Sequence, residues 1–150
     1  MEHEDYMRQA LKLACKAAKL NEVPVGCVIV KDATIIARGY NRRETDSSAL
    51  LHAEAIAIDA ACRKLGDWRL DGCSLYVTLE PCLMCAGAIL NSRISQVYFG
   101  AHDLTAGACG GVLNVFLEGF GPSPAITGGV LEAECSELMS QFFRHIRKKI

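Results

Sequence analysis

Apolar residues recur at helical spacing near both ends of the chain. In the N-terminal stretch they fall every three or four positions, at Met7, Leu11, Ala14 and Ala18. This spacing places them on one stripe and predicts an amphipathic helix over residues 4–20. The same spacing returns near the C-terminus, at Met139, Phe143, Ile146 and Ile150. A second amphipathic helix is therefore expected from about residue 132 onward.

The middle of the chain alternates between β-rich runs and helical segments. The β-rich runs cover residues 25–30, 34–40, 74–79, 96–100 and 125–131, and the first two flank a short turn in the manner of a hairpin. An alanine-rich segment over residues 52–65 stops at Gly66, and Pro81 opens a segment that runs to Asn91, so both are predicted helices. Residues 112–117 are compatible with a further short helix.

This order of elements predicts an α/β fold. Roughly two dozen residues separate the last two strands, which is enough for a crossover, so these strands can run parallel. The sequence contains no internal repeat, linker or low-complexity tract. We therefore expect a three-layer α/β/α sandwich around a mixed five-stranded sheet, formed as a single domain by residues 1–150.

The composition limits the classes of function. Hydrophobic residues make up 51% of the 150 residues, and a chain of this size buries roughly 70% of the surface that it exposes when unfolded. Lys and Arg number 16 against 17 for Asp and Glu, so a broadly basic nucleic-acid coat is excluded and any nucleic-acid contact must be local. Because the first residues are acidic and no apolar run approaches about 18 residues, we expect a soluble cytoplasmic protein.

The cysteines carry the first sign of chemistry. Of the eight, only Cys82 and Cys85 form a close pair, and without an export signal the reducing cytosol favours thiols over disulfides. The isolated cysteines are interpreted as small core residues: Cys15, Cys27, Cys62, Cys73, Cys109 and Cys135.

Cys82 and Cys85 are spaced to bind one metal ion. At positions i and i+3 they project from one helical face, and the N–H groups and positive dipole of a helix start favour the thiolate that binds zinc. With His52 as a third ligand, zinc would leave its fourth tetrahedral position to water, which is typical of a catalytic site. A structural zinc would need a fourth protein ligand, for which the chain offers only isolated candidates: Cys73, Cys109 and His102.

Glu54 follows His52 by two residues, a spacing that needs a particular backbone. On a regular helix, residues i and i+2 point about 200° apart, so both side chains cannot face one metal from mid-helix. We therefore expect His52 at the helix entrance, where the imidazole and the carboxylate can converge. Glu54 would then be a proton shuttle that does not bind the zinc. A solvent-facing helix glutamate is the alternative.

His-x-Glu with Pro-Cys-x-x-Cys downstream is the signature of zinc-dependent deaminases. Further segments spread over nearly the whole chain also resemble the bacterial tRNA-specific adenosine deaminases of that superfamily: Val23–Gly26, Tyr40–Arg42, Leu75–Ala88, Ser92–Ile94, Phe99–Asp103 and Phe142–Arg144. The resemblance to this family implies the cytidine-deaminase-like form of the α/β/α sandwich.

The resemblance also implies a reaction, a cofactor and a partner. The expected activity is hydrolytic conversion of adenosine to inosine at the wobble position of a tRNA anticodon, by a homodimer with one zinc ion per subunit. Zinc-bound hydroxide would attack the purine C6, while Glu54 moves a proton from water to the ring N1 and then protonates the departing ammonia. The tRNA anticodon loop suits this role because a base can be splayed from it without melting a duplex.

The resemblance assigns roles by position. The implied zinc ligands are His52, Cys82 and Cys85, and the implied acid/base is Glu54. The implied substrate contacts are Asn41 and the Ala53 backbone at the base, Asp103 near a neighbouring ribose, and Phe143 with Arg144 at a terminal-helix edge facing the RNA loop. The concentrated basic patch of the chain is Arg144, Arg147, Lys148 and Lys149, for which a solvated helix end is the alternative interpretation.

Two segments depart from the family pattern outside the metal site. Residues 46–51 replace the Asp-Pro-Thr-Ala pattern that often precedes His-Ala-Glu, and residues 117–124 lack an Asn-His pair that many relatives carry. These departures leave a deaminase of a free base or nucleoside, of the guanine or cytosine type, as an alternative. A zinc-stabilised binding module in which Glu54 has no chemical role is a third hypothesis.

One glycine-rich segment, residues 107–111, invites a different interpretation. It lacks the Gly-Lys-Ser/Thr continuation of a phosphate-binding loop, so we interpret it as a plain turn.

Overall fold

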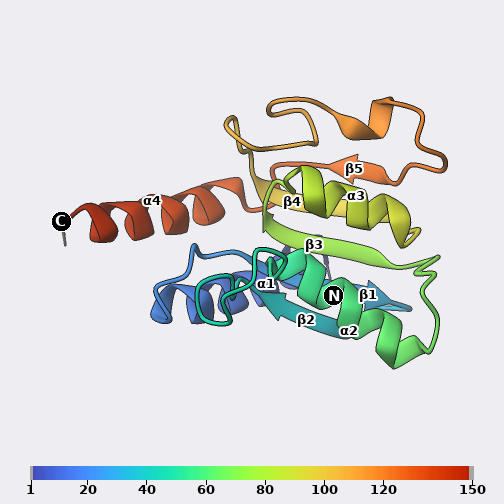
Figure 1. The fold of residues 1–150 in the computed structure, drawn as a ribbon, viewed down its shortest axis with the longest axis horizontal. Coiled ribbons are helices and arrows are strands. Elements are labelled where there is room, and N and C mark those ends of the chain that lie inside the picture. The colour runs from blue at the N-terminus through green and yellow to red at the C-terminus, as the bar shows by residue number, and fades with distance from the viewer. Residues whose placement is uncertain (1, 149–150) are drawn as a thin grey trace.

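A five-stranded sheet organises the protein in the computed structural model, which describes residues 2–148 (Figure 1). The elements in chain order are α1 (His3–Lys19), β1 (Gly26–Lys31), β2 (Thr34–Tyr40), α2 (Ala53–Leu65), β3 (Ser74–Leu79), α3 (Leu83–Asn91), β4 (Gln96–Ala101), the short 3-10 helix η1 (Val115–Leu117), β5 (Ala125–Thr127) and α4 (Glu132–Lys148). The strand order is β2-β1-β3-β4-β5.

The sheet is mixed, as predicted. β1 pairs antiparallel with both β2 and β3, whereas β3, β4 and β5 run parallel. The expectation of parallel final strands is therefore confirmed. All residues of β1 except the last are buried, which is typical of a central strand that is covered on both faces.

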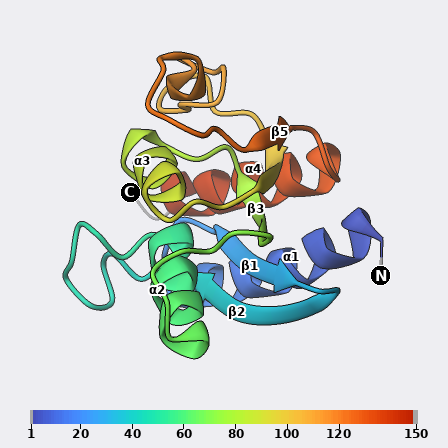
Figure 2. The ribbon, with the colours of Figure 1, turned by 90° about the vertical axis from the view of Figure 1, so that its right-hand side faces the viewer.

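Helices cover both faces of the sheet and form the predicted three layers (Figure 2). α1 packs on β1 and β3 and α4 on β4, while α2 packs on β1 and β2 and contacts α3. The larger apolar core lies under α2 and α3, and a second core cluster lies under α1. No helix within residues 2–148 is long and apolar enough to cross a membrane.

Two glycines allow helices to approach the sheet very closely. A Cβ atom on Gly26 of β1 would overlap the Ala10 carbonyl oxygen of α1, and a Cβ atom on Gly39 of β2 would overlap the Ala53 carbonyl oxygen of α2. In α1 the buried stripe differs from the predicted one. The buried residues are Tyr6, Met7, Ala10, Leu13, Ala14 and Ala17. Leu11 and Ala18 are only partly buried.

Replacing Gly39 with alanine is expected to lower the free energy of unfolding by about 1–3 kcal/mol, because the added methyl group overlaps the backbone of α2. Gly87→Ala is the matched control, since a Cβ atom there meets nothing within 4 Å. Gly87 lies within α3, where alanine has a higher helix propensity than glycine. Urea unfolding of the two zinc-loaded variants measures the difference. Equal stability would contradict the close packing of β2 against α2.

The predicted stripe of the last helix is only partly buried. Cys135 and Phe142 are the buried residues of α4, Met139 and Ile146 are half-buried, and Phe143 remains 42% exposed. The C-terminal half of α4 projects beyond the sheet, so it has few partners to cover its apolar side chains (Figure 1). Ile150 and Lys149, which belong to the predicted stripe and basic patch, lie outside the described residues.

Three smaller expectations need correction. The strand expected over residues 125–131 ends at Thr127, because Gly128 packs against the Phe99 ring and Gly129 adopts a left-handed φ of 85°. The short helix expected over residues 112–117 is reduced to η1, which begins after the N-cap Asn114. Cys27, Cys73 and Cys135 are buried as expected and Cys62 and Cys109 are half-buried, but Cys15 is exposed on the outer side of α1.

Candidate active site

Both parts of the predicted metal site lie at helix entrances. His52 is the N-cap of α2, with φ −78° and ψ 155°, and Cys82 is the N-cap of α3, with φ −76° and ψ 177°. The extended backbone expected at His52 is therefore present. α3 begins at Leu83 rather than at Pro81, because Cys82 forms an isolated β-bridge with Gly107 that keeps its backbone extended.

The three predicted ligands converge on one point. Nδ1 of His52 lies 3.6 Å from Sγ of Cys82 and 3.6 Å from Sγ of Cys85. All three ligand atoms lie within 4.8 Å of one another. Zinc–sulfur bonds of about 2.3 Å and zinc–nitrogen bonds of about 2.0 Å, at a tetrahedral angle, place nitrogen and sulfur roughly 3.5 Å apart. The spacing and the donor types therefore fit a zinc ion.

The cluster contains three protein ligands. Over residues 2–148 no other His, Cys, Asp or Glu joins it, and the candidates for a fourth ligand of a structural zinc, Cys73, Cys109 and His102, are not members. His102 instead faces the carboxylates of Glu80 and Glu132, at 3.7 and 3.8 Å. One imidazole and two thiols form the donor set of catalytic rather than structural zinc sites.

The two cysteines differ in acidity because they share a hydrogen bond. The bond from the Cys85 thiol lowers the pKa of Cys82 to about 4, and His52 lowers it further against the effect of burial. The same bond, together with burial, raises the pKa of Cys85 well above its usual range. The hydrogen bond between His52 and Cys82 raises the pKa of His52. One thiolate is therefore ready for the metal, and the second proton leaves when the metal binds.

Glu54 lies beside the ligands without being one of them. Its side chain is 4% exposed, and burial raises its pKa to about 7, although a hydrogen bond with Cys85 opposes the shift. Glu54 is not a member of the three-ligand cluster. A carboxyl group that titrates near neutral pH can both accept and release a proton, so its environment suits a proton shuttle.

Two of the three ligands, His52 and Cys82, line a pocket whose other walls come from three connecting segments. His52, Cys82 and Glu54 share it with Val23 and Val25 before β1, with Asn41 and Arg43 after β2, and with Asp103 and Ala106 after β4. Ala53 also lines the pocket, so Asn41, Ala53 and Asp103, which the resemblance implies as substrate contacts, lie around the same pocket as His52 and Cys82.

Asn41 and Asp103 are both oriented by backbone groups. Nδ2 of Asn41 donates to the Val23 carbonyl oxygen at 3.2 Å, and its Oδ1 accepts from the Arg43 amide at 3.1 Å. Oδ1 of Asp103 accepts from the Thr105 and Ala106 amides, at 3.0 and 3.1 Å. These bonds give the two pocket walls a defined shape.

Phe143 and Arg144 lie farther out. Phe143 lines a neighbouring groove between α4 and the segment after β4, and this groove shares Val23, Leu79 and Asp103 with the metal pocket. Arg144 lines neither; its guanidinium pairs with Glu137 at 3.0 Å on the same helix.

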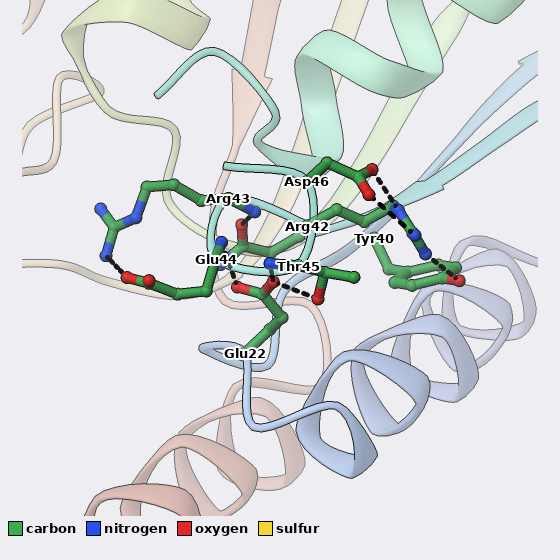
Figure 3. A network of polar contacts seen from close by, with 8 residues as sticks. Glu22, Tyr40, Arg42, Arg43, Glu44, Thr45 and Asp46 are labelled. Carbon is green, nitrogen blue, oxygen red and sulfur yellow. Dashed lines mark hydrogen bonds and ion pairs between the residues drawn. The ribbon is translucent and has the colours of Figure 1, made fainter. Parts of the chain in front are cut away.

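A buried carboxylate holds the segment after β2 in place (Figure 3). Glu22 is 1% exposed, and its two oxygens accept from the Glu44 amide at 3.1 Å, the Thr45 amide at 2.6 Å and the Thr45 hydroxyl at 2.6 Å. Burial raises the pKa of Glu22, but these hydrogen bonds outweigh burial and the pKa is lowered. In the same segment, Arg42 binds Asp46 and the Tyr40 hydroxyl (Figure 3).

The depressed pKa of Glu22 predicts a pH-dependent contribution to stability. Because the folded state holds the proton less tightly than the unfolded state, the contribution is present above the unfolded pKa of about 4.5 and is lost as pH falls through the folded pKa. Glu22→Gln should thus be less stable than wild type at pH 7, with a gap that narrows below pH 4.5. Urea unfolding at pH values from 7 to below 4.5 measures this gap in the free energy of unfolding. The exposed Glu118→Gln variant is the control. A gap that widens at low pH would contradict the assignment.

Comparison with known proteins identifies the family. Residues 1–101 match the family model described as the cytidine and deoxycytidylate deaminase zinc-binding region. The chain is 50% identical to the tRNA-specific adenosine deaminase of Bacillus subtilis (strain 168), over 97% of this chain and 91% of the relative. The chain belongs to the tRNA-specific adenosine deaminases of this zinc-binding family. The expectation of a zinc-dependent deaminase is confirmed.

Solved structures of deaminases share the fold. One, from biochemical and structural studies of A-to-I editing by tRNA:A34 deaminases at the wobble position of transfer RNA, has a TM-score of 0.84 at 40% identity and covers 89% of this chain and 98% of its own. The guanine deaminase from Bacillus subtilis has a TM-score of 0.66 at 41% identity and covers 79% of this chain and 75% of its own. The cytidine-deaminase-like sandwich is therefore confirmed.

The segments that depart from the deaminase family pattern do not line the metal pocket. No residue of 46–51 or of 117–124 contributes to it. Phe120 lies instead in a separate pocket with Leu83 and Leu90.

Sequence reasoning about this deaminase missed two pocket residues, Arg43 and Glu80. Arg43 directly follows the resembling segment Tyr40–Arg42, and Glu80 lies within the resembling segment Leu75–Ala88; these positions were the available signal.

Proposed function

We propose that this chain hydrolyses adenosine to inosine at the wobble position of a tRNA anticodon, as one deaminase domain with one zinc ion per subunit. The observation that carries the proposal is the convergence of His52, Cys82 and Cys85 beside the buried Glu54. It is supported by the 50% identity to a tRNA-specific adenosine deaminase over nearly the full length of both chains.

His52, Cys82 and Cys85 would hold the zinc, and the bound ion would supply the Lewis acidity that makes water nucleophilic near neutral pH. Glu54 accepts a proton from the attacking water as the water oxygen bonds to purine C6. Glu54 then delivers that proton to ring N1. It then takes the remaining water proton to the leaving nitrogen as the C6–N6 bond breaks. Adenosine and water thus become inosine and ammonia.

The pocket walls supply the substrate contacts of the proposal. Asn41 and the Ala53 backbone would hydrogen-bond the base, and Asp103 would lie near the ribose of a neighbouring nucleotide. Phe143, exposed on the adjoining groove, offers an aromatic face to an unstacked base of the loop. Arg144, nearby on α4, would contact the RNA backbone after releasing Glu137.

A homodimer is the proposed assembly, with tRNA as its partner. Large apolar side chains are exposed around α2, α3 and the segment before β5: Leu50, Leu83, Val112, Leu113, Leu117 and Phe120. Leu83 and Phe120 line one pocket. Exposed apolar side chains that lie together mark an association surface, which a second copy would cover.

Deamination of a free base or nucleoside, of the guanine or cytosine type, is the second candidate. It is supported by the 41% identity to the guanine deaminase from Bacillus subtilis. The first candidate is preferred because the identity to the tRNA-specific enzyme is higher and spans more of the chain.

The deciding experiment offers both substrate types to the zinc-loaded protein. An anticodon stem-loop with adenosine at the wobble position and a panel of free bases and nucleosides are incubated separately, and nucleosides are analysed by mass spectrometry. Inosine in the stem-loop is the expected result. Ammonia release from guanine or cytosine with an intact stem-loop adenosine would overturn the proposal in favour of the second candidate.

A further inference from the structure

Glu80 is a buried carboxylate at the pocket that the mechanism does not use. It lies directly before Pro81 and Cys82 and is 2% exposed. One side-chain oxygen accepts from the Asp103 amide at 3.1 Å, and the other accepts from the Cys109 and Gly111 amides at 2.9 Å each. Three main-chain N–H groups from residues 103–111 therefore converge on one carboxylate.

Two glycines of residues 103–111 leave room for this carboxylate. A Cβ atom on Gly107 would overlap the Glu80 carboxylate, and a Cβ atom on Gly111 would lie 2.9 Å from Oε2 of Glu80. The segment over residues 107–111, which the sequence predicts as a plain turn, is thus a backbone cradle for an anion. The anion is a side chain of the same protein rather than a phosphate.

Residues 103–111 join the pocket wall to Pro81 and Cys82. Asp103 and Ala106, at the start of this segment, line the pocket. Gly107 forms a β-bridge with Cys82, and the Ala108 amide donates to the Pro81 carbonyl oxygen at 2.9 Å. Glu80 is therefore placed where one side chain can fix the wall relative to the metal ligands.

We propose that Glu80 is a positioning residue for substrate, which holds residues 103–111 as the wall against which the target nucleotide binds. This inference rests on the proposed function. Glu80 acts through Asp103 and Ala106 and is not assigned a contact with the reacting atoms. Its removal should therefore weaken substrate binding more than it slows the chemical step.

Glu80→Gln is a sharp test because the two side chains have nearly the same shape. Both carboxylate oxygens face N–H donors, and a carboxylate accepts at both oxygens. An amide has a single oxygen, so its NH₂ group must face either the Asp103 amide or the Cys109 and Gly111 amides. At least one wall contact is lost in either orientation.

The experiment measures steady-state kinetics on the anticodon stem-loop, zinc content and backbone amide exchange. For Glu80→Gln we expect KM to rise by about 10-fold or more, kcat to change by less than about 3-fold and zinc content to stay unchanged. Amide exchange at Asp103, Cys109 and Gly111 should accelerate by about 10-fold or more, because these amides lose their acceptor. The exposed Glu4→Gln, on α1, is the matched control and should behave as wild type.

A folded Glu80→Gln variant with KM within about 2-fold of wild type would overturn the proposal, as would loss of zinc as the sole cause of lost activity. If this variant fails to fold, Gly111→Ala disturbs the same wall, because the added Cβ atom would overlap the Asp103 carbonyl oxygen and lie 2.9 Å from Oε2 of Glu80; an unchanged KM there has the same meaning. If the wild type leaves the stem-loop intact, the proposed function fails. Amide exchange then still decides whether Glu80 holds this wall.

Discussion

Replacing Glu54 with glutamine is expected to lower kcat/KM for deamination by about 10³-fold, within the range that general acid–base groups contribute. Glutamine keeps the size of the side chain but cannot carry a proton between water, the ring N1 and the leaving nitrogen. Glu54 is buried and burial raises its pKa to about 7, which suits the proposed role of its carboxyl group. Single-turnover deamination of the anticodon stem-loop measures the loss.

The control for this variant is its zinc content. Glu54 is not a member of the ligand cluster, so Glu54→Gln should retain zinc at the wild-type level, as measured by elemental analysis. A variant that keeps zinc and loses activity separates catalysis from metal binding. Undiminished deamination by Glu54→Gln would contradict the role of Glu54 as the proton shuttle.

Replacing Cys85 with serine is expected to lower the zinc content by about 10-fold or more and to abolish deamination, because one of three protein ligands is lost. A serine hydroxyl is far less acidic than the thiol, and the Cys85 side chain also donates the hydrogen bond that lowers the pKa of Cys82. The thermal midpoint should fall as well, because zinc binds the folded state.

Cys15→Ser is the matched control for the loss of zinc. It makes the same chemical change at an exposed cysteine on α1, outside the ligand cluster. Zinc content, activity and thermal midpoint should all remain at the wild-type level. Full zinc content in Cys85→Ser would contradict the three-ligand site.

The elements and the three side chains that lie together as candidate metal ligands could be predicted from the sequence because each depends on local pattern. The mixed sheet followed from strand-like runs separated by helical segments, and the crossover before β5 followed from its length. His52 could be placed at a helix entrance because no other position lets it act with Glu54. Cys82 and Cys85 could be paired because they lie three residues apart in the sequence.

The walls around that site were decided by the tertiary structure. Glu80 meets Gly111 across 31 residues of chain and Glu22 meets Thr45 across 23, and no periodicity or spacing marks such pairs. The close approach of α1 to β1 at Gly26 likewise joins residues that are distant in the sequence. Short-range order follows from backbone preferences and side-chain periodicity, whereas a buried carboxylate finds its N–H partners only after distant segments have packed. The sequence thus determined the chemistry available, and the packing of distant loops determined the shape that receives the substrate.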